Sequence, residues 1–232
     1  KKKYGFVTPD LADVIIALGG DGTILETLHT FLKKRLPIYG MNRGHIGFLM
    51  NEYSEENLID RVNLANATKL FPLKIKSYLI NGEVKESIAF NDVSLIRDTR
   101  QIAKISIEVN GIKKIDQLLC DGCLISTPAG SSAYNLSLRG PVVPVDAQLL
   151  ALTPISPYRP RRWRGALLPN TVKITLTGIE VNKRPLRAEA DFFEVKAIKK
   201  LEIELDKSQY INLLFDKGHD LEERIINEQF IY

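Results

Sequence analysis

The residues best suited to chemistry near the start of the chain are Gly19-Gly20-Asp21-Gly22-Thr23, a glycine turn with a carboxylate at its centre. Glycine lets a backbone approach a ligand closely, and a helix N-terminus offers free N–H groups to an anion. A carboxylate there repels phosphate unless it takes a proton or holds a metal ion. The stretch therefore indicates phosphate chemistry. Glycine and aspartate are also ordinary turn and N-cap residues, so on these residues alone the structural interpretation is equally open.

Known phosphate-binding patterns do not cover this turn. The run is not G-x-G-x-x-G, and no G-K-[ST] follows it, so both the dinucleotide fingerprint and the P-loop are absent.

The elements that must position this turn are a strand before it and a helix after it. Residues 14–18 are continuously apolar, which is typical of a strand buried on both faces. Apolar residues then recur every three or four positions and predict an amphipathic helix ending before Pro37, with Ile24, Leu25, Leu28, Phe31 and Leu32 on one side. Residues 37–41 resemble a second buried strand, so we expect a parallel α/β layer whose ligands lie at the carboxyl ends of its strands.

From about residue 71 the hydrophobic period changes from helical to alternating. Asn81-Gly82 and Asn110-Gly111 each separate two alternating segments and predict β-hairpins. Helical spacing returns at residues 220–230, which we expect to fold back onto the α/β layer. The expected domains are thus residues 1–70 plus 218–232, an α/β domain, and residues 71–217, a mainly antiparallel β domain.

Three further stretches carry more polar, glycine and proline residues than a sheet needs. They are Asn91-Asp92, then Asp121-Gly122 followed by residues 126–134, and finally Asp191. In the second stretch a strand breaks at proline and glycine, and hydroxyl side chains precede a short helix, an arrangement that suits a polar ligand such as a ribose. Each stretch alone is more typical of Asx turns, Ser/Thr turns and a surface acid.

Composition narrows the class of protein. The chain has 232 residues, of which 44% are hydrophobic and 26% charged, as in soluble globular proteins. Its net charge of +4 is too weak to argue for a nucleic-acid partner, and it contains no run of eighteen apolar residues for a membrane span and no visible signal peptide. The pair Cys120 and Cys123 lacks the nearby histidines of a zinc site, so we expect buried reduced thiols and a cytoplasmic protein. Three scattered histidines give no Ser-His-Asp set.

Taken together and in this order, the motifs resemble the NAD kinase family. The resemblance rests on Gly-Gly-Asp-Gly-Thr, the Asn91-Asp92 pair, Asp121-Gly122, and the run Ser-Thr-Pro-x-Gly-Ser-x-Ala-Tyr at residues 126–134, and it extends through residues 152–157. The first motif also occurs in diacylglycerol, sphingosine and phosphofructo-kinases, whereas the loop at 127–134 is far more specific. The resemblance implies a Rossmann-like N-terminal domain, here lacking its first strand, and a C-terminal β-sandwich-like domain.

The resemblance also implies a reaction, transfer of the γ-phosphoryl group of ATP to the 2′-hydroxyl of the adenosine ribose of NAD. Asp21 would be the catalytic carboxylate that orients or deprotonates this hydroxyl, and Mg²⁺ bound with ATP would offset its repulsion of phosphate. Asn91 and Asp92 would hold the adenosine. The remaining family positions line the phosphate path or pack around NAD; they are Gly20, Gly22, Thr23, Phe48, Asp121, Ser132, Ala133, Tyr134 and Asp191. No residue is assigned as a metal ligand, and the family forms homodimers and homotetramers.

The sequence departs from the family pattern at four places: Ala129 replaces a hydroxyl residue, Ser132 a threonine, Arg139 the first glycine of a pair, and Phe192 a glycine after Asp191. The cluster at residues 159–164 is strongly basic and is more typical of a solvated or subunit-contact segment than of a nucleic-acid site. Two alternatives stay open, a lipid kinase of the same superfamily and a dinucleotide-binding module without catalysis.

Overall fold

The chain folds into two compact units in the computed structural model, which describes residues 7–44 and 47–218. Unit 1 comprises Lys1–Phe71 and Ser208–Tyr232, and unit 2 comprises Pro72–Lys207. The helix expected at 220–230, together with His45 and His219, lies outside the described residues. No helix in the described part of the chain is long and apolar enough to span a bilayer.

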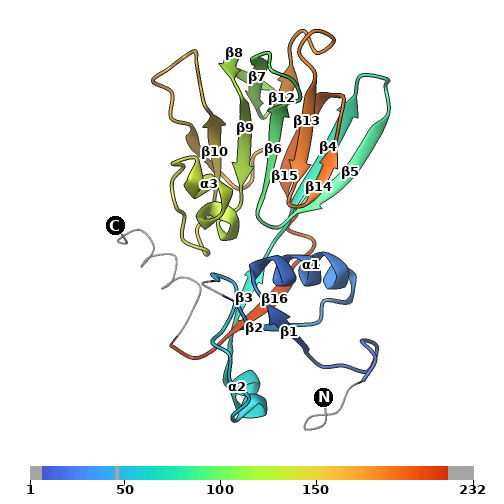
Figure 1. Ribbon diagram of the computed structural model, residues 1–232, viewed down its shortest axis with the longest axis vertical. Helices are drawn as coiled ribbons and strands as arrows, with labels where there is room; N and C mark the ends of the chain where they lie inside the picture. Colours follow the sequence, from blue (N-terminus) through green and yellow to red (C-terminus); the bar gives the residue numbers. More distant parts are fainter. Residues whose placement is uncertain (1–6, 45–46, 219–232) are drawn as a thin grey trace. The chain divides into compact units, whose positions relative to one another are not determined.

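Unit 1 contains a four-stranded sheet with helix α1 packed on one face (Figure 1). The strand order is β1 (Ile15–Gly19), β2 (Ile38–Asn42), β16 (Ile211–Phe215) and β3 (Asn66–Leu70). The first three strands run parallel, and β3 pairs antiparallel with β16. The helical segments are α1 (Asp21–Phe31), η1 (Leu32–Lys34) and α2 (Leu58–Leu64). The expected strand, turn and helix order around residues 14–41 is confirmed.

Strand β1 is buried on one face only, which corrects the expectation that both faces are covered. Ala17 is 6% exposed, whereas Ile16 and Leu18 are 36% and 54% exposed. Ala17 pairs with Gly40, against which the Ile24 side chain of α1 packs, so the helix covers the Ala17 face. Successive side chains of a strand point to opposite faces, and the continuous apolar run therefore did not reveal that one face lies open.

The C-terminal boundary of the β domain, expected at residue 217, also differs from the expectation. Residues 208–217 were assigned to the β domain, but β16 pairs with β2 and β3 in unit 1. An alternating five-residue strand fits either sheet, so its pattern does not identify its partners.

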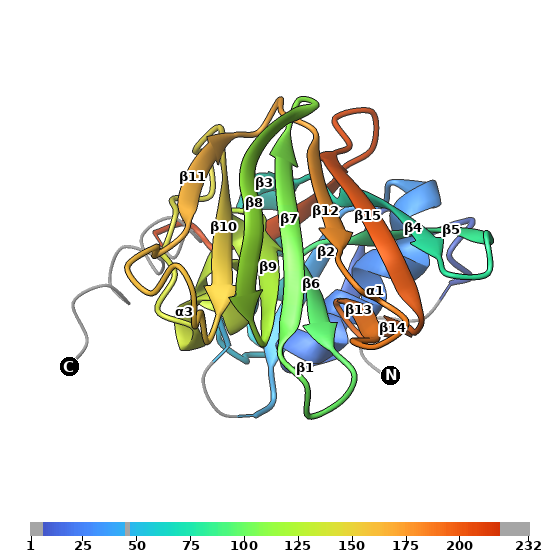
Figure 2. The same ribbon diagram turned by 90° about the horizontal axis from the view of Figure 1, so that it is seen from above.

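Unit 2 consists of two six-stranded sheets with a shared hydrophobic core. One sheet has the order β11 (Ala166–Pro169), β10 (Leu149–Ile155), β9 (Gly122–Ser126), β6 (Asp92–Arg97), β13 (Leu186–Ala190) and β14 (Phe193–Val195). The other, whose strands lie side by side in Figure 2, has the order β5 (Val84–Ala89), β4 (Leu73–Leu79), β15 (Ile198–Leu205), β12 (Ile174–Gly178), β7 (Ala103–Val109) and β8 (Ile112–Cys120). This is the expected β-sandwich-like arrangement.

Both hairpins predicted from Asn-Gly pairs are present in unit 2. Asn110 and Gly111 connect β7 to β8 with φ of 51° and 75°, the left-handed values that a two-residue hairpin turn requires. Gly82, with φ of 90°, lies in the connection from β4 to β5. Cys120 and Cys123 are buried and free, and burial raises the pKa of the Cys120 thiol to about 12. The prediction of buried reduced thiols is therefore confirmed.

Candidate functional site

The Asp21 carboxylate holds the backbone of a neighbouring loop. Asp21 is the first residue of α1, and its Oδ2 accepts a hydrogen bond from the Phe48 N–H at 2.8 Å. Its Oδ1 accepts one from the Leu49 N–H at 3.0 Å. A β-carbon on Gly47 would stand 2.7 Å from the Asp21 Oδ1, so glycine there admits the carboxylate. The structure thus brings Asp21 and Phe48 together, and Asp21 has a fixed orientation with lone pairs left for a further proton or donor.

Among the residues that the structure describes, none explains by packing why two of the turn positions, Gly20 and Gly22, are glycine. A β-carbon on Gly20 or Gly22 would meet nothing within 4 Å. Neither residue has a left-handed φ, so any side chain could adopt their backbone conformation. Gly19 differs, because a β-carbon there would collide with the Thr23 side chain at 2.2 Å. The open space beside Gly20 and Gly22 is what a closely approaching ligand requires.

In unit 2, Asn91 and Asp92 occupy a turn at the start of β6, and the Asp191 carboxylate binds the backbone of this turn. Asp191 accepts hydrogen bonds from the backbone N–H groups of Phe90, Asn91 and Asp92 at 2.7, 3.0 and 3.3 Å. The structure therefore brings these three predicted site residues together, although Asp191 follows Asp92 by 99 positions in the chain.

The loop after β9 holds the same turn from its other side. The Thr127 N–H donates to the Asn91 carbonyl oxygen at 2.9 Å, and the Thr127 hydroxyl donates to the Phe90 carbonyl oxygen at 2.6 Å. The Gly130 N–H in turn donates to the Thr127 Oγ1 at 3.1 Å. Thr127 thus joins the site as a residue whose positioning contacts the sequence did not reveal.

After this contact the chain forms η2 (Ala129–Ser132) and α3 (Tyr134–Ser137). Ser132 is 9% exposed, whereas Ala133 is exposed and Tyr134 is 41% exposed. The Ser131 hydroxyl donates to Pro128 O and accepts from Val143 N–H, and the Asn135 Oδ1 accepts from the Thr153 hydroxyl at 2.6 Å. Hydrogen bonds of the buried Ser131 and Asn135 therefore fix the segment, and Ala133 and Tyr134 lie on its exposed side.

The Asp92 carboxyl lies in an unusual electrostatic environment. Burial raises its pKa to about 7, and the carboxylates of Asp191 and Glu189 contribute to the shift. Burial, together with Glu189 and Asp92, also raises the pKa of Tyr134. Glu189 is thus a further acid near this group. The sequence carried a signal for this face of β13: residues 187 and 189 are two positions apart, so their charged side chains lie on the same face of the strand.

Asp121 is separated from the Asn91–Asp92 turn along the sheet and has its own partner. It follows β8, and its carboxylate pairs with Arg97 at 2.6 Å, with both side chains about one-third exposed. Asp121 also contributes to the raised pKa of Tyr134, which places the two groups within electrostatic range. A ligand contact at Asp121 would have to be shared with Arg97.

At residues 139 and 140 the backbone accounts for the glycine pair that the family pattern carries, of which this chain keeps only Gly140. Arg139 has φ of 60°, the region where glycine is favoured, and its side chain is exposed. Gly140 is required by packing, because a β-carbon would stand 2.1 Å from the Asn135 Oδ1.

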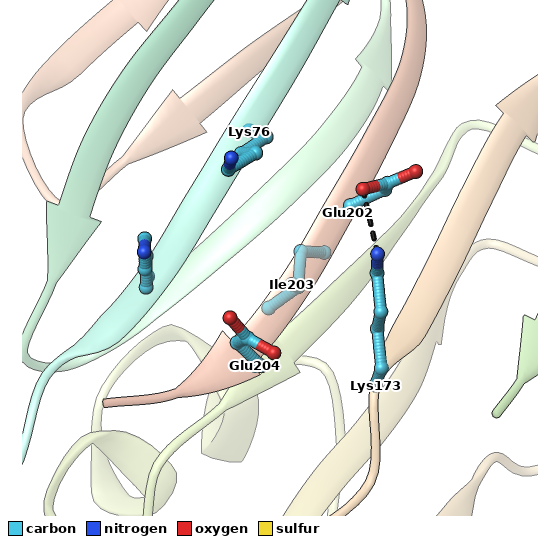
Figure 3. A pocket seen from close by; sticks show the side chains of 6 residues that line it. Lys76, Lys173, Glu202, Ile203 and Glu204 are labelled. Carbon is cyan, nitrogen blue, oxygen red and sulfur yellow. Dashed lines mark ion pairs between the residues drawn. The ribbon is translucent and has the colours of Figure 1, made fainter. Parts of the chain in front are cut away.

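A shallow pocket on the outer face of the β4–β15–β12 region offers no comparable site. Lysine and glutamate side chains line its volume of about 150 Å³, with Lys173 paired to Glu202 at 2.8 Å (Figure 3). Lys173 and Lys200 lower the pKa of Glu202 to about 2. None of the lining residues belongs to the predicted site residues.

No dedicated metal cage is present among residues 7–44 and 47–218, where no three His, Cys, Asp or Glu side chains are grouped closely enough to hold a metal ion. Mg²⁺ commonly binds through one or two carboxylates together with substrate phosphates. Asp21, beside the open glycine turn, fits that mode of binding.

Comparison with known proteins identifies the family of this chain. Residues 6–65 match the family model of the ATP-NAD kinase N-terminal domain, and residues 90–189 match that of the ATP-NAD kinase C-terminal domain. An NAD kinase of Caulobacter vibrioides is 50% identical over 228 residues, which cover 98% of this chain and 88% of that protein. The chain belongs to the NAD kinase family.

Other relatives agree with this assignment. An NAD kinase of Brucella suis is 47% identical over 229 residues, covering 99% of this chain and 89% of that protein. Among solved structures, an Archaeoglobus fulgidus NAD kinase in complex with ATP has a TM-score of 0.74 at 25% identity, over 95% of this chain and 84% of that chain. Yeast NADH kinase complexed with NADH has a TM-score of 0.83 at 23% identity, over 94% and 66% of the two chains, and shares the fold.

As a member of the NAD kinase family, the protein is an enzyme that phosphorylates NAD. The lipid-kinase and non-catalytic alternatives are not favoured, because full-length relatives at 44–50% identity are named NAD kinase.

Proposed function

We propose that this NAD kinase uses ATP as the phosphoryl donor and the 2′-hydroxyl of the adenosine ribose of NAD as the acceptor, giving NADP and ADP. The observation that carries the proposal is the open space at Gly20 and Gly22, which neither packing nor φ explains. These glycines precede or begin α1, whose free N–H groups suit the phosphates of a nucleotide. Thr23 would complete the phosphate path.

Asp21 would act on the acceptor hydroxyl. As the ribose oxygen forms its bond to the γ-phosphorus, the bond to the bridging oxygen of ADP breaks and the hydroxyl proton passes to the Asp21 carboxylate. The amide bonds from Phe48 and Leu49 support this role, because they fix the carboxylate before substrate arrives. Proton acceptance by a positioned group contributes about 10²–10⁴-fold.

The remaining residues would bind NAD. Asn91 and Asp92 would hold the adenosine, and the acceptor capacity of Asp92 suits a ribose hydroxyl. The other binding residues that we propose are Phe48, Asp121, Ser132, Ala133, Tyr134 and, through the backbone that it holds, Asp191. The exposure of Tyr134 supports a contact with ligand.

A divalent cation, Mg²⁺ or another, would enter with ATP and neutralise phosphate charge. The cation would also offset the repulsion between the phosphates and the Asp21 carboxylate, which lies beside the open glycines. We further propose a cytoplasmic homodimer or homotetramer without a nucleic-acid or membrane partner. The buried free thiols support a reducing compartment, and light scattering of the purified protein would give the oligomeric state.

The test is to supply the purified protein with Mg²⁺, ATP and either NAD or diacylglycerol. NADP should form, with its new phosphate on the 2′-oxygen, and no phosphorylated lipid should appear. In Asp21→Asn we expect kcat to fall by about 10²-fold or more. Asp13→Asn, at an exposed acid shortly before β1, is the matched control and should keep wild-type kcat.

An amide has one oxygen and can accept only one of the two backbone bonds, so hydrogen exchange at Phe48 and Leu49 should accompany the assay. Near-normal kcat in Asp21→Asn would remove Asp21 from the catalytic role.

A further inference from the structure

The Asp191 carboxylate accepts hydrogen bonds from backbone N–H groups of a distant segment. Asp191 lies between β13 and β14 with φ of 51°, a left-handed conformation that aspartate adopts more readily than most residues. Its Oδ2 accepts from the Phe90 N–H at 2.7 Å, and its Oδ1 accepts from the Asn91 and Asp92 N–H groups at 3.0 and 3.3 Å. Hydrogen bonds from N–H groups to an ionised acceptor are about twice as strong as neutral ones.

A backbone hydrogen bond adds to the contact between Asp191 and residues 90–92, and further hydrogen bonds hold the other side of this segment. The Asp191 N–H donates to the Asp92 carbonyl oxygen at 3.1 Å. The Asn91 carbonyl oxygen accepts from the Thr127 N–H at 2.9 Å and from the Ser126 hydroxyl at 3.3 Å. The backbone of residues 90–92 is therefore fixed between Asp191 and the loop that begins at residue 126, while the Asn91 and Asp92 side chains are left to make other contacts.

The surrounding sheet does not depend on this carboxylate. Strand β13 pairs with β6 through five register positions, from Leu186 opposite Arg97 to Ala190 opposite Val93. The inward-facing Ala188 and Ala190 are also part of the hydrophobic core of unit 2. Loss of the Asp191 carboxylate would therefore loosen the 90–92 turn and leave the pairing of β13 with β6 in place.

We propose that Asp191 is a positioning residue, which sets the direction of the Asn91 and Asp92 side chains by holding three consecutive backbone N–H groups rather than by contacting the dinucleotide. The proposal rests on the proposed function, in which Asn91 and Asp92 hold the adenosine of NAD. Asp191 then contributes to NAD affinity indirectly, by fixing the backbone from which the Asn91 and Asp92 side chains extend.

The test compares Asp191→Asn with Asp191→Gly. Glycine keeps the left-handed conformation without strain and removes every side-chain acceptor, whereas asparagine keeps one acceptor oxygen. We expect KM for NAD to rise about tenfold in Asp191→Gly and less in Asp191→Asn, in line with the loss of charged acceptors. KM for ATP should stay near the wild-type value, and kcat at saturating NAD should change less than KM for NAD. Glu194→Gln, a half-exposed acid in the same hairpin, is the control and should leave both KM values unchanged.

Hydrogen exchange of the NAD-free protein separates positioning from direct contact. In Asp191→Gly the amides of Phe90, Asn91 and Asp92 should lose protection, while those within β13 and β6 should keep it. Unchanged protection at residues 90–92, or a KM for NAD within about twofold of wild type, would overturn the proposal. A similar rise in both KM values together with a similar fall in kcat would indicate a general structural role and would also overturn the proposal. If the wild type made no NADP the proposed function would fail, and the exchange result would still report whether Asp191 holds the turn.

Discussion

Gly130 lies directly against the backbone of Asn91. A β-carbon on Gly130 would stand 2.2 Å from the Asn91 carbonyl oxygen and 2.5 Å from its Cα, a separation that no side chain can occupy. The backbone atoms of Asn91 cannot withdraw, because Thr127 and Asp191 hold them. Glycine at this position is therefore a condition for joining the loop after β9 to the turn that carries Asn91.

Gly130→Ala should separate these two segments. We expect a loss of about 1–3 kcal/mol in the free energy of unfolding, as for other overpacked sites, together with a raised KM for NAD. Denaturant titration and steady-state kinetics would measure the two effects. Gly20→Ala is the matched comparison, because its β-carbon meets nothing within 4 Å and should cost no stability. A fully stable, fully active Gly130→Ala would contradict the packing described.

Gly22→Ala should stabilise the folded protein and lower its catalytic activity. Gly22 lies in the first turn of α1 with open space around it, and alanine is the better helix former by about 0.5–1 kcal/mol. The added methyl group should obstruct phosphate and lower kcat/KM for ATP. Thermal unfolding and kinetics on one preparation would check both signs. Unchanged kcat/KM would show that ligand does not approach Gly22.

The stability of the folded protein should depend on the ionisation of Asp92. Its pKa is raised to about 7, so between about pH 4 and pH 7 the folded state binds more protons than the unfolded state. The contribution of this group to stability is therefore present below about pH 4 and is lost as pH rises through 7. Denaturant titrations across this range should show a smaller decline in Asp92→Asn than in wild type. Equal pH profiles for the two proteins would refute the shift.

Binding of NAD should depend on the same group with the opposite sign. Ionised Asp92 is the better acceptor for a ribose hydroxyl, so affinity for NAD should rise about tenfold between pH 6 and pH 8. Calorimetric titration with NAD would measure it. Asp191, Glu189 and Tyr134 are the titratable groups in range of Asp92, so Glu189→Gln should shift the midpoint downward without abolishing the dependence. An affinity independent of pH would exclude Asp92 as an acceptor.

Arg61→Ala should destabilise unit 1. Arg61 pairs with Asp216 at 2.5 Å and donates to the Ser54 and Glu52 carbonyl oxygens, and the Tyr39 hydroxyl also donates to Asp216. These mostly buried bonds to charged groups are worth about 2 kcal/mol or more in total. Hydrogen exchange should show the loss in β2 and β16 but not in unit 2. The exposed pair of Lys34 with Asp10 is the control, and Lys34→Ala should cost less than about 1 kcal/mol.

Features encoded within a few residues were predictable from the sequence, and those that join distant segments were not. The turn at Asn110-Gly111 depends on two adjacent residues, and it was predicted correctly. Strand β16 was placed in the wrong domain, because its pairing with β2 leaves no mark on its own five residues. The roles of Thr127 and Asp191 were equally hidden, since Asp191 bonds to a backbone N–H 100 residues away. Even at Asp21 the sequence indicated a chemical role but not the loop that it holds.

The order of strands in unit 1 has a consequence for protein synthesis. Strand β16 lies between β2 and β3, yet it is translated after every residue of unit 2. A chain growing on the ribosome can therefore complete both β-sheets of unit 2 while the sheet of the earlier-made N-terminal segment still lacks an inner strand. A chain that terminates before residue 211 would leave β2 and β3 without the strand that joins them. Synthesis of β16 thus decides whether the sheet that carries the glycine turn at Asp21 is completed.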